Sequence, residues 1–157
     1  PCPCGNMGST KTCICAPGEL ARYKRKVSGP IMDRIDLWVY VGPVEFDILT
    51  GKRKSDGESA RVRSVIEEAR RRQRGRLGAG RTNAQMSSRD IEDNVPLSSS
   101  VLALLKDASS RLSLSPRSYH KIVKCARTIA DLAGEEDISD AHVLEALQYR
   151  PQESLRY

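Results

Sequence analysis

Four cysteines within the first fifteen residues constrain the start of this chain more than any other feature. Cys2 and Cys4 form one Cys-x-Cys pair, and Cys13 and Cys15 form a second pair eight residues later. Two close pairs of thiolates can converge on one tetrahedral Zn²⁺, and thiolates also suit an iron–sulfur cluster. The usual zinc motif has two residues inside each pair, so free thiols, or disulfides between the pairs, remain alternatives. We favour a Cys-rich loop over residues 1–16 that holds a structural metal.

The composition points to a soluble domain with an aliphatic core. The chain has 157 residues, 39% of them hydrophobic, but only one Trp and one Phe. No apolar run approaches the ~20 residues of a membrane span, and the start lacks the apolar region of a secretory signal. It also lacks an initiator Met, which suggests a piece cut from a longer protein. We therefore expect a cytoplasmic protein without a membrane partner, in which clustered thiols hold metal rather than form disulfides.

The positive charge is concentrated in one block. The net charge is +6, and residues 52–81 hold eleven Lys and Arg against four Asp and Glu. A helix is predicted from about Glu58 to Arg76, with a narrow apolar stripe that packs weakly. A solvated charged helix is the common explanation for such a block, but it can also neutralise phosphates. The candidate DNA contacts are Arg70, Arg71, Arg72, Arg74 and Arg76.

The rest of the pattern predicts a mainly α protein. A helix is expected from Pro17, a turn at 31–34, a buried strand over 36–41 and a Gly-rich linker over 75–88. Four helices then follow, and they are expected to bury one shared aliphatic core. Their approximate extents are 88–94, 98–112, a helix from Ser115 to a stop at Gly134, and one from 138 to before Pro151.

Several motifs resemble one known family. They are Pro-Cys-Pro-Cys-Gly, the later Cys-x-Cys, Ser28-Gly-Pro-Ile-Met-Asp-Arg-Ile-Asp36, Leu114-Ser-Pro-Arg-Ser-Tyr-His120, Ala126-Arg-Thr-Ile-Ala-Asp-Leu-Ala-Gly134 and Ala146-Leu-Gln-Tyr-Arg150. Together they are similar to the C-terminal portion of the magnesium-chelatase-like AAA+ ATPases of the ComM/YifB type. That family is associated with competence and DNA processing, and resembles hexameric helicases that drive branch migration.

The resemblance implies a domain order. Residues 1–50 would be the remnant of an AAA+ α/β core, with one strand and the Cys-rich loop. Residues 51–87 would be the basic helix and linker, 88–150 the four-helix AAA+ lid, and 151–157 a tail. The sequence contains no Gly-x-x-x-x-Gly-Lys-[Ser/Thr] phosphate loop and no apolar strand that ends in Asp-Glu. ATP and Mg²⁺ would thus be cofactors of a full-length parent, and this segment alone should not hydrolyse ATP.

Two arginines gain roles from the resemblance. Arg34, between Asp33 and Asp36, would be an arginine finger that reaches the γ-phosphate held by a neighbouring subunit. A permanently charged planar guanidinium suits the charge that develops on phosphoryl oxygens. Arg117, at the start of a helix, would be the lid residue that senses the nucleotide. The alternatives are an Arg34 paired within its own chain and an ordinary exposed Arg117.

Three functions remain open at this level. The first is the lid and interface portion of a DNA-remodelling AAA+ motor, which is expected to assemble as a homo-oligomer in the form of a hexameric ring. The second is a chelatase-type motor that acts on a protein partner in metal insertion. The third is a non-catalytic DNA-binding module built from the basic block.

Overall fold

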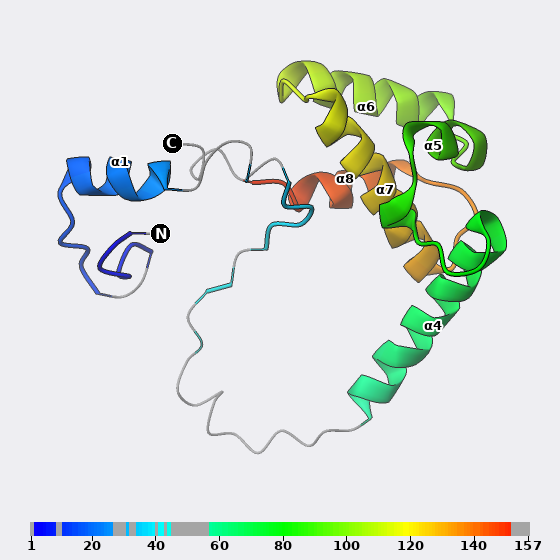
Figure 1. The fold of residues 1–157 in the computed structure, drawn as a ribbon, viewed down its shortest axis with the longest axis horizontal. Helices are drawn as coiled ribbons and strands as arrows, with labels where there is room; N and C mark the ends of the chain where they lie inside the picture. Colours follow the sequence, from blue (N-terminus) through cyan, green and yellow to red (C-terminus); the bar gives the residue numbers. More distant parts are fainter. Residues whose placement is uncertain are drawn as a thin grey trace. The chain divides into compact units, whose positions relative to one another are not determined.

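The computed structural model describes residues 2–8, 11–26, 31, 34–39, 41–42, 44 and 57–151. The chain divides into two compact units. Figure 1 labels its helices along the sequence. We call Pro1–Lys54 with Tyr149–Tyr157 the N-terminal unit, and Ser55–Gln148 the helical unit. Among the described residues, no helix is both long and apolar enough to cross a membrane.

The helical unit is built around one central helix. Its elements are α4 (Glu58–Leu77), the 3₁₀ turn η1 (Asn83–Gln85), α5 (Ser88–Asn94), α6 (Ser99–Arg111), α7 (Pro116–Ala133) and α8 (Asp140–Gln148). Helix α7 packs against α4, η1, α5 and α8, and α6 packs against α8. The chain is therefore mainly helical, and the four helices predicted after residue 88 are confirmed.

Local capping chemistry sets the helix ends where the sequence predicts them. The Ser98 hydroxyl accepts a hydrogen bond from the Val101 N–H at the start of α6 (3.3 Å). Ser115 caps α7 in the same way, with Pro116 at the first helical position. At the other end of α7, Gly134 adopts φ = 80°, the left-handed conformation that glycine reaches without strain. These signals involve only neighbouring residues, so they are readable from the sequence.

An aliphatic core joins these helices. Its buried members come from every element of the unit except η1: Leu77, Met86, Ile91, Val95, Val101, Leu105, Ile122, Val123, Ala126, Ala130, Ile138, Val143 and Ala146. Burial of aliphatic side chains contributes about 1.5–3 kcal/mol each. The helical unit thus has a core of its own.

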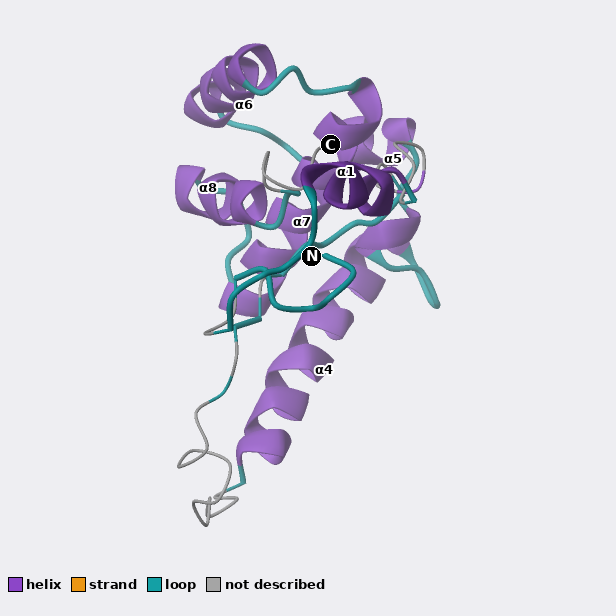
Figure 2. Cartoon of the chain, turned by 90° about the vertical axis from the view of Figure 1, so that its left-hand side faces the viewer, coloured by secondary structure: helices purple, strands orange, loops and turns teal. Residues whose placement is uncertain are grey.

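Helix α4 packs along only half of its length. Ala69, Gln73 and Leu77 are buried in its C-terminal half. Ile66 and Val62 lie on the same stripe, one and two turns before Ala69, and each is 45% exposed. Figure 2 shows the N-terminal half of α4 extending away from the other helices of its unit. The predicted weak packing therefore holds for the first half of the helix.

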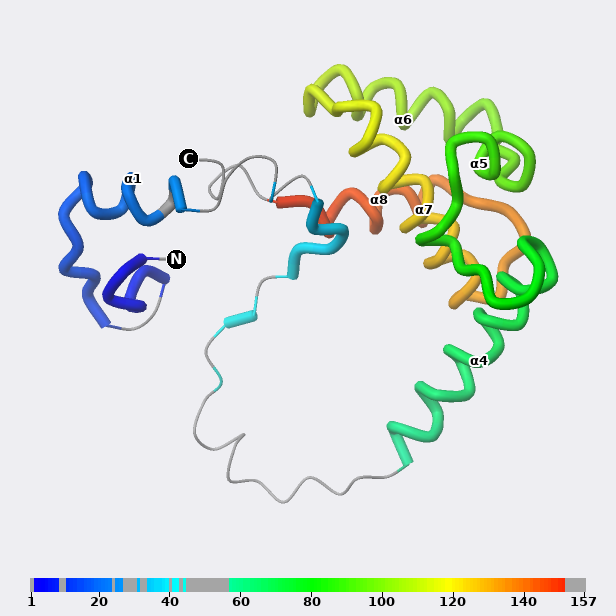
Figure 3. Tube along the Cα trace, in the orientation of Figure 1, coloured from blue at the N-terminus to red at the C-terminus, as the bar shows by residue number. Residues whose placement is uncertain are grey.

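Residues 78–87 are not a loose linker. Asn83 is 1% exposed and Met86 is 3% exposed, and η1 packs against α7. Figure 3 traces this segment as a turn between α4 and α5. Gly75, assigned to the linker from the sequence, lies inside α4. The glycines suggested flexibility, whereas buried polar contacts made by Asn83 hold the segment in place.

The N-terminal unit contains α1 (Pro17–Arg25), which begins at the predicted proline. The predicted turn is also present, because the Arg34 N–H donates to the Ile31 carbonyl (2.9 Å). The helix's predicted face includes Val27, which lies outside the described residues, as do most of the residues between 43 and 56.

The predicted strand over 36–41 is not formed in the described part of the segment. Residues 36–39 and 41 have no strand structure, and Figure 2 draws none. Leu37 and Val39 are 54% and 68% exposed rather than buried. A strand requires a ladder of hydrogen bonds to a neighbouring backbone, and the Trp38 N–H donates to the Tyr149 carbonyl (2.9 Å) without a strand being formed in the described residues. Strand propensity alone therefore did not produce a sheet.

Candidate functional site

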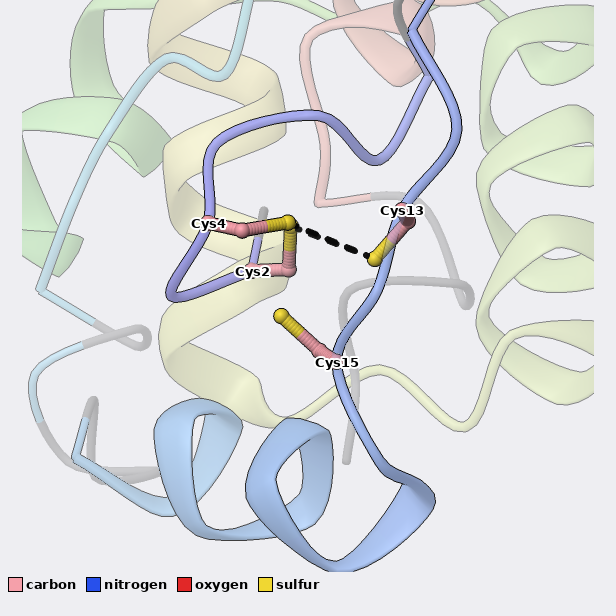
Figure 4. Close-up of side chains that lie close together, drawn as sticks. All are labelled: Cys2, Cys4, Cys13 and Cys15. Carbon is pink, nitrogen blue, oxygen red and sulfur yellow. Dashed lines mark hydrogen bonds between the residues drawn. The ribbon is translucent and has the colours of Figure 1, made fainter.

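The four N-terminal cysteines converge in space. Cys2 and Cys4 lie in a turn closed by the Gly5 N–H donating to the Cys2 carbonyl (3.1 Å). Gly5 has φ = 77°, a conformation that disfavours any residue with a Cβ. Cys13 and Cys15 lie on the extended segment before α1. Figure 4 shows the four side chains pointing toward one another, and their sulfurs all lie within 4.8 Å of one another.

The sulfur–sulfur distances are short but non-bonded. Cys2 Sγ lies 3.4 Å from Cys4 Sγ and 3.7 Å from Cys13 Sγ, and Cys4 Sγ lies 3.6 Å from Cys13 Sγ. All five cysteines of the chain are free thiols. Cys2 is buried, and the other three cluster members are partly buried. The sequence-predicted cluster is thus assembled, and it is able to hold a metal ion.

The pKa values of the Cys4 and Cys15 thiols are shifted in opposite directions. Backbone N–H groups of Asn6 and Ile14 lower the pKa of Cys4 to about 6. The Cys4 N–H also tends to lower the pKa of Cys15. Burial and the neighbouring sulfurs outweigh it and raise the pKa of Cys15 to about 12. Four like charges cannot gather at this distance without a cation, because each added thiolate repels the others.

The predicted interface arginines are both on the surface. Arg34 is exposed and follows the turn from Ile31, while Asp33 lies outside the described residues. Arg117 is exposed in the first turn of α7, next to the capped N-terminus. A helix N-terminus carries partial positive charge, which adds to that of the guanidinium.

The arginines of α4 divide into two groups. Arg70, Arg71 and Arg74 are exposed, whereas Arg72 and Arg76 are partly buried. Arg71 and Arg72 both pair with Glu68, and Arg71 Nε donates to it at 2.9 Å. The Arg71 hydrogen bond holds the pKa of Glu68 below its usual value.

Arg76 has a structural partner that sequence reasoning missed. Its Nη2 lies 2.7 Å from Asp131 Oδ2, and the Asp131 side chain is fully buried. Asn83 Nδ2 donates to the same oxygen at 2.7 Å, and Arg127 Nη2 lies 3.2 Å from Asp131 Oδ1. Arg127 also donates to the Glu135 carbonyl (2.8 Å). We call Arg76, Asn83, Arg127 and Asp131 the buried polar network.

The signal for this network was present but weak. Arg127 and Asp131 are four residues apart on the inward face of α7, beside Ala126 and Ala130. Charged residues on an apolar helix face indicate a buried pair, since an unpaired charge would be costly there. The other two members, from α4 and η1, follow no local pattern.

Two family descriptions match the chain. "Magnesium chelatase, subunit ChlI C-terminal" matches residues 56–150, and "Magnesium chelatase, subunit ChlI" matches residues 1–49. The chain belongs to the magnesium-chelatase-like AAA+ family. The boundary between the two matches lies in the same part of the chain as the division between its two compact units.

The relatives place it more closely within this family. Competence protein ComM of Haemophilus influenzae is 37% identical over 150 residues, which cover 96% of this chain and 29% of ComM. An uncharacterized protein of Mycobacterium tuberculosis is 35% identical over 153 residues, covering 96% of this chain and 30% of that protein. Uncharacterized protein YifB of Escherichia coli is 34% identical over 137 residues, covering 87% and 26%. The chain is of the ComM/YifB type, and it spans less than a third of the length of these relatives.

Proposed function

We propose that this chain is the lid and interface portion of an ATP-driven motor that remodels DNA in competence or recombination. The observation that carries the proposal is the similarity to Competence protein ComM over 150 residues. The parent would bind ATP and Mg²⁺ in its nucleotide core and assemble as a homo-oligomeric ring, which we take to be hexameric. The ring matters because a residue on one subunit then faces the nucleotide of the next.

Arg34 is the residue assigned to that interface. Its exposed position after a tight turn supports the assignment, because a finger must extend beyond its own subunit. Its guanidinium would stabilise the charge on the transferred phosphoryl group, which is a transition-state effect rather than a binding effect. Arg117 would contact nucleotide from the lid, where the α7 N-terminus favours an anion.

Part of α4 is assigned to DNA. Arg70 and Arg74 are exposed and lie one turn apart, so they share a helix face, and Arg71 is exposed beside them. Arg72 and Arg76 are less suitable, because both are partly buried and Arg76 also pairs with the buried Asp131. Arg71 also pairs with Glu68, but its side chain remains 74% exposed. The proposed DNA contacts are therefore Arg70, Arg71 and Arg74.

A subunit-mixing experiment in the full-length parent tests the role of Arg34. Arg34→Ala should lower ATP turnover about 10³–10⁵-fold while nucleotide binding persists. Arg34→Lys should also be impaired, since an ammonium lacks the planar fork. Arg25→Ala, which removes an exposed arginine of α1, is the matched control and should leave turnover unchanged.

The mixture itself decides whether the residue acts in trans. Arg34→Ala subunits combined with subunits defective only in their own phosphate loop should recover part of the turnover. Recovery is expected because an intact loop and an intact finger would meet at some interfaces of the mixed ring. Absence of recovery in rings shown to contain both subunits would assign Arg34 to an ion pair within its own chain.

DNA stimulation of the same ATPase separates this proposal from a metal-insertion motor. Branched DNA should raise turnover, and Arg70→Ala with Arg74→Ala should weaken the stimulation in a salt-dependent manner. Arg89→Ala with Arg111→Ala, at side chains that are 90% and 76% exposed on α5 and α6, is the charge-matched control. An ATP turnover rate that DNA leaves unchanged, but that a protein partner raises, would favour the chelatase-type alternative.

A further inference from the structure

We propose that Cys2, Cys4, Cys13 and Cys15 bind a single Zn²⁺ as a closed structural site. This inference goes beyond the motor function and does not depend on it. It rests on how the chain brings four sulfurs to one point, and on the size of the space between them.

The spacing of the sulfurs fits one metal ion. With Zn–S bonds of 2.3 Å, the edge of a tetrahedron of four sulfurs is about 3.8 Å. The sulfurs of Cys2, Cys4 and Cys13 are separated by 3.4, 3.6 and 3.7 Å, and no pair in the cluster is separated by more than 4.8 Å. The sulfurs of Cys2, Cys4 and Cys13 are therefore within a few tenths of an ångström of the spacing that a tetrahedral zinc site requires.

The same spacing argues against a disulfide and against an iron–sulfur cluster. A disulfide requires a sulfur–sulfur distance of about 2.05 Å, which no pair approaches. An iron–sulfur cluster places two or more iron atoms and bridging sulfides between opposite cysteines, so it needs a wider opening than one ion. Sulfurs that all lie within 4.8 Å of one another leave room for a single ion only.

Backbone donors support thiolate charge at this site. The Met7 N–H donates to Cys2 Sγ at 3.3 Å. Cys4 receives the N–H groups of Asn6 and Ile14, so the turn and the extended segment both contribute to one sulfur. Four thiolates around Zn²⁺ carry a net charge of −2, and N–H groups aimed at the sulfurs offset that excess. Such a second shell is what distinguishes a metal site from a chance group of thiols.

The ligand set points to zinc with a structural role. Thiolates are soft ligands that select zinc among the common divalent ions, and a closed tetrahedral S₄ set is typical of structural zinc sites. Four protein ligands leave no open coordination position for a substrate or an activated water. The site can therefore hold the fold but cannot itself perform hydrolysis.

The part of the fold that the ion would hold is the entry to α1. Cys15 is followed directly by Ala16, whose N–H donates to Glu19 Oε2 (2.9 Å) and whose carbonyl accepts the Leu20 N–H (3.1 Å). The last metal ligand is thus one residue from the first turn of the helix. The ion would fix the Cys-rich loop and the start of α1 together, and among the described residues of this part of the chain Cys2 is the only buried side chain.

The first experiment measures the metal content of the whole chain, purified untagged under reducing conditions. We expect about one zinc per chain by elemental analysis, and four sulfurs at about 2.3 Å by X-ray absorption at the zinc edge. Substitution with Co²⁺ should give the visible absorption of a tetrahedral tetrathiolate site. Stoichiometric iron, nitrogen or oxygen ligands, or no metal with four freely titratable N-terminal thiols, would overturn the proposal.

Variants locate the site. Cys4→Ser with Cys13→Ser should abolish zinc binding, while Cys125→Ser should retain one zinc per chain. Cys125 is the matched control because it is the remaining cysteine and packs against the core of the helical unit. The far-ultraviolet circular dichroism signal of the helices should persist in both variants, since the helical unit has its own core. Zinc retained by the double variant would place the ion elsewhere and refute the assignment.

Discussion

Replacing Asp131 with alanine should be the most damaging single change in the helical unit. Its carboxylate is fully buried and lies within 2.7 Å of both Arg76 Nη2 and Asn83 Nδ2. It also faces Arg127, whose side chain is only 2% exposed. Burial lowers the pKa of Arg127, and Asp131 acts against that shift. Without the carboxylate, a buried guanidinium keeps its charge but loses its counter-ion.

The magnitude follows from that imbalance. Removing one partner of a buried ion pair costs about 3–5 kcal/mol, because an uncompensated charge is left behind. Arg127 keeps its hydrogen bond to the Glu135 carbonyl, which argues for the lower part of this range. For a domain of this size each 1 kcal/mol shifts the melting temperature by about 4–8 °C, so the expected loss is at least about 12 °C.

The assay is urea unfolding followed by circular dichroism, with Asp107→Ala as the matched control. Asp107 accepts from Arg111 Nε at 2.8 Å in an i, i+4 pair on α6, but both side chains are more than half exposed. Exposed pairs of this kind contribute about 0.3–0.5 kcal/mol. If Asp131→Ala does not fold, Asp131→Asn can replace it, because asparagine keeps the shape of the side chain but removes its charge. Asp131→Asn should also lose more stability than Asp107→Ala. Equal, small losses at Asp131 and Asp107 would refute the reasoning.

Two further predictions concern α5 and the glycines. Arg81 and the N-cap serine of α5 hold the pKa of Asp90 well below its usual range. The stability that Asp90 contributes is therefore full above its unfolded pKa of about 3.9 and is lost as the pH falls below it. Asp90→Asn should lower the melting temperature at pH 7 but progressively less below pH 4, whereas Asp93→Asn, at a 65% exposed side chain on the same helix, should change the melting temperature little at pH 7. Gly134→Ala should cost about 1–2 kcal/mol, because Gly134 has φ = 80°. Gly75→Ala should stabilise by about 0.5–1 kcal/mol, because Gly75 lies inside α4 with open space at its Cβ position; thermal melts that rank these two variants in the opposite order would contradict the helix-end argument.

Much of the fold was readable from local patterns. The serine cap at 115, the proline at 116 and the glycine at 134 predicted the boundaries of α7. The two Cys-x-Cys pairs predicted a cluster, and the structure brings the four sulfurs together. These features depend on residues close in the chain, and the required geometry is largely set by the backbone near each of them.

The strand over 36–41 and the linker over 75–88 were predicted less well, for a shared reason. Strand formers describe only what a segment prefers, and pairing requires a second backbone that the local sequence does not specify. Glycines likewise indicate only which backbone conformations a segment can adopt. Whether the segment is mobile depends on buried contacts such as that of Asn83 with Asp131.

The sequence by itself determined the helices, the paired cysteines and the position of the basic block. Only the tertiary structure decided which arginines of that block remain exposed. Arg74 and Arg76 are two residues apart and chemically identical, yet Arg74 is exposed and Arg76 binds a carboxylate 55 residues away. The reason is that helical periodicity turns the two side chains to different faces, and the packing of α4 against α7 gives only one of those faces a buried partner.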